Sequence, residues 1–131
     1  MKIEIVVDAN IIISALIGGS PREILFDHRF KFLTTEFTIN EVKKYIPMIS
    51  EKTNTDEEYI LKTLDLIPLD IKEKDFYDES KEEAFDLIGE IDKKDVEILA
   101  LALETDNYLW SEDKDFKEAG YKKLIKTKDF F

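Results

Sequence analysis

Short apolar runs alternate with longer amphipathic stretches along the chain. Residues 3–7 (IEIVV), 31–34 (KFLT) and 108–111 (YLWS) each read as a short buried strand. The runs 66–70 (LIPLD) and 123–127 (KLIKT) are candidates for the third strand and the last one. Strands that alternate with helices indicate βαβ units. We therefore expect an α/β fold, a three-layer αβα sandwich around a twisted, mainly parallel sheet of about five strands.

Capping residues predict where the helices begin and end. Asn10 can N-cap a helix through IIISALI, which Gly18 and Gly19 end. In four further segments a Ser or Thr is followed three residues later by Glu, which is the pattern of a capping box. These predicted boxes are Ser20 with Glu23, Thr38 with Glu41, Thr55 with Glu58, and Ser80 with Glu83. The first three of these helices have predicted ends near His28, Pro47 and Leu64.

Composition narrows the class of protein. With 131 residues, 44% hydrophobic and 37% charged, the chain is predicted to be one globular domain over residues 1–131. Cysteine is absent, which excludes disulfides, thiolate metal sites and cysteine nucleophiles. The N-terminus does not read as a signal peptide, and no apolar run is long enough to span a membrane. We expect a cytoplasmic protein that does not bind membranes.

The net charge of −11 argues against nucleic acid as a partner, because a phosphate backbone would be repelled at long range. That argument loses force if the acids gather into a site that binds divalent cations. The bound ions would then dominate the local field.

Acidic residues follow strands or open helices at several separate places. Asp8 directly follows the first strand and Asp113 lies just beyond the strand at 108–111. Glu41 is expected in the first turn of the helix after the second strand, and Asp92 and Asp95 precede the apolar helix VEILALAL. In open parallel sheets, ligands bind outside the carboxyl ends of the strands. The sequence therefore predicts that these carboxylates meet at one edge of the sheet.

Each of these residues also has a structural interpretation. Asn10 favours an N-cap role, Glu41 could serve its capping box, and Asp92 and Asp95 suit the positive end of a helix. Taken together, however, crowded carboxylates would repel one another and be driven toward protonation. Mg²⁺ and Mn²⁺ accept such oxygen ligands and can promote phosphodiester hydrolysis.

Other functional classes fit less well. The one histidine, His28, is predicted to lie within a helix, at the surface or in the core rather than in a catalytic site, and no Gly-rich phosphate loop or nucleophile elbow occurs. A haloacid-dehalogenase-like phosphatase would need an aspartate where Asn10 stands. A receiver-like domain could use Asp70 as its phosphoacceptor, but the paired acids near the first strand are missing.

Four segments together, VVDANIIISAL, TINEV, IDKKDVEILALAL and LWSEDKDF, resemble the PIN domain family, which includes the VapC-type toxins. The resemblance covers essentially the whole chain. It implies a Mg²⁺- or Mn²⁺-dependent ribonuclease built on a five-stranded parallel sheet with its acids at one edge. It assigns the catalytic acids to Asp8, Glu41, Asp95 and Asp113.

Within that resemblance, Asp8, Asp95 and Asp113 would bind metal, and Glu41 would complete the coordination or orient the attacking water. The expected supporting residues are Asn10, Ser111 and Asp92. Whether Asp92 or Asp115 also binds metal stays open at this point.

The resemblance also implies partners. These are an RNA substrate, an antitoxin protein and a second copy of the chain in a homodimer. The substrate-binding residues are unknown, and the basic candidates near the acids are Lys43, Lys44, Lys93, Lys94 and Lys114. Trp110 is predicted to lie in the core rather than to stack on a base. The alternative to an enzyme is a catalytically silent PIN-like module that binds RNA or protein.

Overall fold

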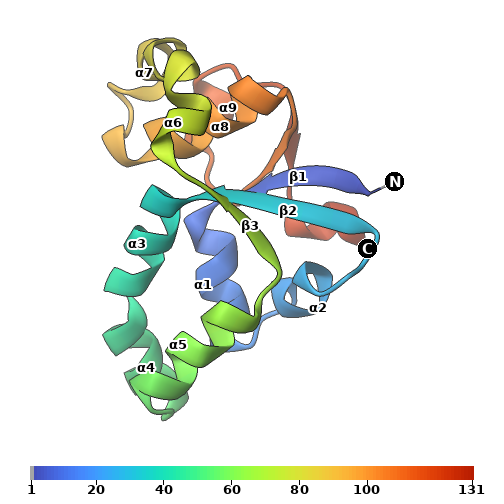
Figure 1. Cartoon of the computed structure of the whole chain (residues 1–131), viewed down its shortest axis with the longest axis vertical. Coiled ribbons are helices and arrows are strands. Elements are labelled where there is room, and N and C mark those ends of the chain that lie inside the picture. The colour runs from blue at the N-terminus through green and yellow to red at the C-terminus, as the bar shows by residue number, and fades with distance from the viewer. Residues whose placement is uncertain (1) are drawn as a thin grey trace.

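The computed structural model describes residues 2–131 and shows one five-stranded parallel sheet in the order β3-β2-β1-β4-β5 (Figure 1). The strands are β1 (Ile3–Val7), β2 (Phe30–Thr35), β3 (Leu69–Lys72), β4 (Tyr108–Trp110) and β5 (Leu124–Ile125). The predicted α/β sandwich with a parallel sheet of five strands is confirmed.

Helices cover both faces of the sheet (Figure 1). One layer consists of α1 (Ala9–Ile17), α2 (Pro21–Leu25), α3 (Glu36–Lys44), α4 (Ile46–Thr53) and α5 (Glu57–Leu66). The other elements are α6 (Lys74–Tyr77), α7 (Lys81–Ile88), α8 (Val96–Thr105), α9 (Asp115–Glu118) and the 3₁₀ turns η1 (Asp78–Ser80), η2 (Lys93–Asp95) and η3 (Thr127–Phe130). Within residues 2–131, no helix has both the length and the apolar composition needed to cross a bilayer.

The carboxyl-terminal part of the central strand β1, residues 5–7, is buried on both faces. Val7 belongs to the core beneath α1 and Val6 to the core beneath α8, as the alternation of side chains along a strand requires. Trp110 lies in the α1-side core with no exposed surface, so its predicted core position is confirmed. Its indole nitrogen donates to Thr127 Oγ1 at 3.1 Å, which ties the C-terminal segment to β4.

Strand order brings the candidate acids together. The strands β2 and β3 follow on one side of β1 in the sheet, and the order then reverses, so that β4 and β5 lie on its other side. Such a reversal opens a crevice at the carboxyl ends of the two central strands. Val7 pairs with Trp110 in the ladder, so Asp8 and Ser111 emerge side by side at this crevice.

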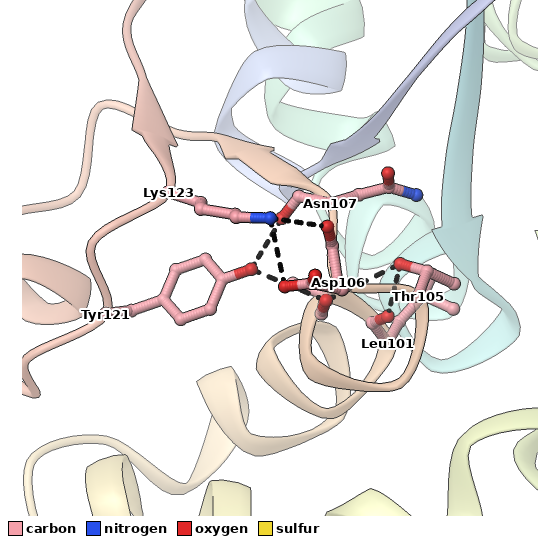
Figure 2. Close-up of polar contacts among 7 residues, drawn as sticks. Leu101, Thr105, Asp106, Asn107, Tyr121 and Lys123 are labelled. Carbon is pink, nitrogen blue, oxygen red and sulfur yellow. Dashed lines mark hydrogen bonds and ion pairs between the residues drawn. The ribbon is translucent and has the colours of Figure 1, made fainter.

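A polar cluster fixes the end of α8 that lies far from the crevice (Figure 2). The Tyr121 hydroxyl donates to the carbonyl oxygens of Asn107 and Ala102, and Lys123 pairs with the Asp106 carboxylate at 3.0 Å. Asp106 itself ends α8 in the left-handed conformation. These contacts join the C-terminal end of α8 to the segment that leads into β5.

The predicted N-caps of the first and third helices were wrong. Asp8, not Asn10, caps α1, because its carboxylate accepts from the Ala9 amide at 2.8 Å. Thr35, not Thr38, caps α3 by accepting from the Thr38 amide. The helix therefore begins three residues earlier than expected, and Glu41 lies in its second turn rather than its first.

The other predicted capping boxes do not form. Ser20 precedes α2 without a side-chain cap, and α2 ends at Leu25, so that His28 lies in an exposed turn. Thr55 donates instead to the Thr53 carbonyl oxygen, and α5 begins at Glu57. Ser80 precedes α7, but its hydroxyl donates to Glu104 rather than capping the helix.

Four strands differ from their predicted bounds, and the second is one residue longer at each end than predicted. The third strand begins after Pro68 and extends to Lys72, because α5 continues to Leu66. The fourth ends one residue early, at Trp110. The last strand contains only Leu124 and Ile125, since the chain enters the η3 turn at Thr127.

Candidate functional site

A cavity of about 170 Å³ opens at the carboxyl edge of the sheet. Carboxylates from four separate segments contribute to its wall. Its lining residues are Asp8, Ala9, Asn10, Ile13, Phe37, Thr38, Glu41, Tyr45, Asp92, Lys94, Asp95 and Asp113. The carboxylates that the sequence placed at one edge of the sheet thus surround one space.

Asp8 is held in place by contacts from two strand ends. Its side chain is 6% exposed, and one carboxylate oxygen accepts from the Ala9 amide. The other oxygen accepts from the Ser111 hydroxyl at 2.7 Å and from the Asn10 amide nitrogen at 3.4 Å. Burial raises the pKa of Asp8 to about 6, although the Ser111 and Ala9 hydrogen bonds act in the opposite direction.

The turn after β4 is organised by two side-chain acceptors. The Asp113 amide donates to Ser111 Oγ at 3.0 Å, and the Asp115 amide donates to the Asp113 carboxylate at 2.9 Å. Ser111 therefore links this turn to Asp8. The same hydroxyl oxygen accepts from the Asn10 side chain at 3.3 Å.

Asp95 is the most perturbed acid of the site. It ends η2, N-caps α8 and is 7% exposed. Burial, followed by the charges of Asp8, Asp92, Asp113 and Asp115, raises its pKa to about 8. One of its carboxylate oxygens is buried without a hydrogen-bond partner among the described residues, as is Asn10 Oδ1. A buried carboxylate with these neighbours requires either a proton or a cation.

A second grouping of acids overlaps the first. Asp92, Asp95 and Asp115 can each place one carboxylate oxygen within 4.8 Å of the others, a spacing that could hold a metal ion. Asp92 also caps the short turn η2 by accepting from the Lys94 amide, whereas Asp95 is the N-cap residue of α8. The geometry thus adds Asp92 and Asp115 to the candidate ligands. Asp95 belongs both to this group and to the predicted set of Asp8, Asp95 and Asp113.

Comparison with known proteins agrees with this arrangement. The model of the PIN domain family matches residues 6–129 of the sequence. The chain belongs to the PIN domain family. A search of curated proteins found no match for the sequence. Among solved structures, the chain is similar in fold to a chain of VapBC2 from Rickettsia felis, crystallised bound to a DNA fragment from their promoter. The two chains share 17% identity and a TM-score of 0.67, over 95% of this chain and 98% of the other.

Glu41 lies on the α3 wall of the cavity in this PIN domain. Its carboxylate accepts from Lys44 Nζ at 2.9 Å, and only 14% of its side chain is exposed. The other predicted basic residues divide into two groups. Lys94 lines the cavity, whereas Lys43, Lys93 and Lys114 are exposed residues that do not line it.

Sequence reasoning missed the apolar wall of this cavity in the PIN domain. Ile13 of α1, Phe37 of α3 and Tyr45 at the α3–α4 junction all line it. A signal was available, because Phe37, Glu41 and Tyr45 are spaced four residues apart and so share one helical face. The late predicted start of α3 concealed that relation.

Proposed function

We propose that this PIN domain is a divalent-metal-dependent endoribonuclease that cleaves RNA phosphodiester bonds by hydrolysis. The observation that carries the proposal is the buried carboxylate of Asp95, which has an unpartnered oxygen and faces other carboxylates in one open cavity. Such a group is costly in a metal-free protein, which favours a role in binding a cation. Membership of the PIN family supports the same conclusion.

The residues present fit a hard cation, Mg²⁺ or Mn²⁺. Asp8, Asp95 and Asp113 would hold it, with Asp92 or Asp115 as additional or alternative ligands. All offer carboxylate oxygens, which such ions prefer. When bound, the ion would lower the pKa of a water and offset the negative charge of the phosphate.

The remaining polar residues would position the ligands and the substrate. Ser111 donates to Asp8 and accepts from the Asp113 amide, so it sets the distance between the ends of β1 and β4. Asn10 donates to both Asp8 and Ser111. Glu41, on the opposite wall, would complete the coordination or accept a hydrogen bond from the attacking water. Lys94 would contact an RNA phosphate.

We further propose that the protein acts as the toxin of a toxin–antitoxin pair. The structural similarity to VapBC2 supports this assignment, and an antitoxin with a basic segment would complement the acidic cavity. Induced expression in a bacterial host should arrest growth for the wild type and not for Asp95→Asn. The expected homodimer would have twice the 15.4 kDa mass of the chain, which light scattering on the purified protein can measure.

The direct test is cleavage of a panel of single-stranded and structured RNAs with Mn²⁺, Mg²⁺ or EDTA. Wild type and Asp95→Asn should be purified identically, because contaminating ribonuclease would otherwise mimic activity. We expect cleavage that requires the metal and is lost in the variant. Asp86→Asn is a matched control, since Asp86 is an exposed acid on α7 that does not line the cavity.

Two results would count against the enzyme. Equal cleavage by wild type and Asp95→Asn in EDTA would trace the activity to a contaminant. Folded wild type that binds Mn²⁺ but cleaves nothing in the panel would favour a catalytically silent PIN-like binding module.

A further inference from the structure

One helical face combines an acid of the proposed catalytic site with two aromatic rings. Phe37, Glu41 and Tyr45 follow one another at four-residue intervals along α3, and all three line the cavity. Carboxylates of β1, η2 and the β4 turn line the same cavity. The cavity therefore has an acidic part and an aromatic part within one small volume.

Tyr45 has a fixed backbone and an accessible side chain. Its amide donates to the Val42 carbonyl oxygen at 3.0 Å, and its own carbonyl oxygen accepts from the Ile49 amide at 2.9 Å. It thus belongs at once to the end of α3 and the beginning of α4. Tyr45 is 43% exposed, although a large apolar side chain gains free energy when buried. Phe37, two helical turns earlier, is only partly exposed.

We propose that Tyr45 is a positioning residue that stacks on the base of an unpaired nucleotide next to the scissile phosphate, an inference that rests on the proposed ribonuclease function. Aromatic faces stack on any base, and this interaction is characteristic of proteins that bind single strands. A phosphate held among the acids and their cations leaves its neighbouring base within reach of the cavity wall. Glu41 lies one helical turn before Tyr45 and joins the two parts of the cavity.

The chemistry of the wall favours a base over a second phosphate or a peptide cation at this position. Ile13 and Phe37 add further apolar surface to the same cavity. Of the two lysines in the last turn of α3, Lys44 is paired with Glu41 and Lys43 does not line the cavity, whereas Lys94 does line it and is the residue proposed to contact a phosphate. Stacking also requires no positive charge from the protein, which suits a chain of net charge −11. A base in a duplex is already stacked on both faces, so duplex RNA should gain nothing from Tyr45.

The experiment combines variants of Tyr45 with RNA that lacks single bases. Tyr45→Ala, Tyr45→Phe and Tyr45→Trp are compared with wild type, and Tyr59→Ala is the matched control. Tyr59 is a 65% exposed tyrosine on α5 that does not line this cavity. Each protein is assayed on a cleaved single-stranded oligonucleotide and on copies with an abasic site at each position flanking the cut. Binding of the same RNAs in Ca²⁺ is measured by fluorescence anisotropy.

Tyr45→Ala should raise KM by roughly 5- to 100-fold with little change in kcat, because stacking contributes similarly to the ground and transition states. Tyr45→Phe and Tyr45→Trp should retain wild-type KM, since both keep an aromatic face. One abasic position should raise the wild-type KM comparably and leave that of Tyr45→Ala nearly unchanged. The effects of Tyr45→Ala and of that abasic position on KM are then not additive, which a merely structural role for Tyr45 would not produce.

Additive effects of the variant and every abasic substitution would overturn the proposal, as would equal losses for Tyr45→Ala and Tyr59→Ala. Failure of the ribonuclease function is separable from failure of the stacking role. If wild type cleaves no RNA but the same coupling appears in the binding constants, Tyr45 stacks on a base in a non-catalytic module. If wild type neither cleaves nor binds single-stranded RNA, the stacking role is refuted as well.

Discussion

Asp95→Asn should stabilise the metal-free protein while it removes the stabilisation by metal. The Asp95 carboxyl is buried among four other acids, and its pKa is raised to about 8 from 3.8. At neutral pH the metal-free folded state must keep a proton on Asp95 that the unfolded chain releases. Asparagine has nearly the same shape and carries no charge, so the variant lacks the free-energy cost of keeping this proton in the folded state.

The size of the effect follows from the shift of the pKa. Keeping the proton at pH 7 costs about 4 kcal/mol relative to an unfolded pKa of 3.8. The asparagine NH₂ group would replace a buried carboxyl oxygen that has no hydrogen-bond partner among the described residues, and burying these donors without acceptors costs about 1–3 kcal/mol. The net gain is about 1–3 kcal/mol. For a chain of this length, that gain corresponds to a rise in Tm of roughly 3 to 10 °C.

The assay is thermal unfolding in EDTA and in rising Mn²⁺ or Mg²⁺. Wild type should gain about 2.7 kcal/mol when the free ion reaches a hundred times its Kd. Asp95→Asn should begin with a higher Tm in EDTA and show little further rise with metal. Asp86→Asn, which changes an exposed acid of α7, should follow the wild type in both conditions.

Two outcomes would refute this reasoning. A lower Tm for Asp95→Asn than for wild type in EDTA would mean that the carboxyl is not a destabilising group in the folded state. An equal metal-dependent rise in Tm for the two proteins would mean that the cation binds without Asp95. In the second case the ligands would have to be sought among the remaining acids of the cavity.

Two further predictions concern the same carboxylates. In EDTA, the free energy of unfolding should fall as pH rises from about 4 to about 8. The reason is that the raised pKa values of Asp8 and Asp95 make the folded state bind more protons than the unfolded chain. Urea unfolding across this pH range measures the slope, and a slope of opposite sign would contradict the prediction. Ser111→Ala removes the hydroxyl that donates to Asp8 and should weaken Mn²⁺ binding by roughly 10- to 100-fold in calorimetry, whereas unchanged affinity would show that Ser111 does not orient a ligand.

The fold class could be predicted from the sequence because the pattern of apolar residues follows which side chains are buried in the strands. The runs that became β1, β2 and β4 are all buried toward their carboxyl ends. Caps were predicted poorly for a related reason. Thr35 and Thr38 are both buried hydroxyls in contact with each other, and either could in principle cap a helix. Only the end of β2 decides between them, and that end is set by the pairing of Thr34 and Thr35 with β3.

The position of the acids could be predicted, but not their grouping. A residue after a parallel strand must lie at the carboxyl edge of the sheet, which placed Asp8 and Asp113 correctly beside one cavity. The spacing of Asp92, Asp95 and Asp115 depends instead on the η2 turn and on the turn after β4. Neither turn has a periodic pattern, so their geometry is visible only in the folded chain.

The acidic net charge does not argue against the proposed RNA substrate, because the relevant electrostatics are local. Repulsion of a phosphate backbone by distant carboxylates is screened beyond about 8 Å at physiological salt. Within that distance, this cavity presents carboxylates that suit cations, one lysine and two aromatic rings. Bound ions would neutralise the acids where a phosphate would lie, and the proposed stacking on Tyr45 would not be weakened by charge. A strongly acidic chain can thus support an RNA site, provided that its contacts depend on bound metal and on stacking rather than on a basic surface.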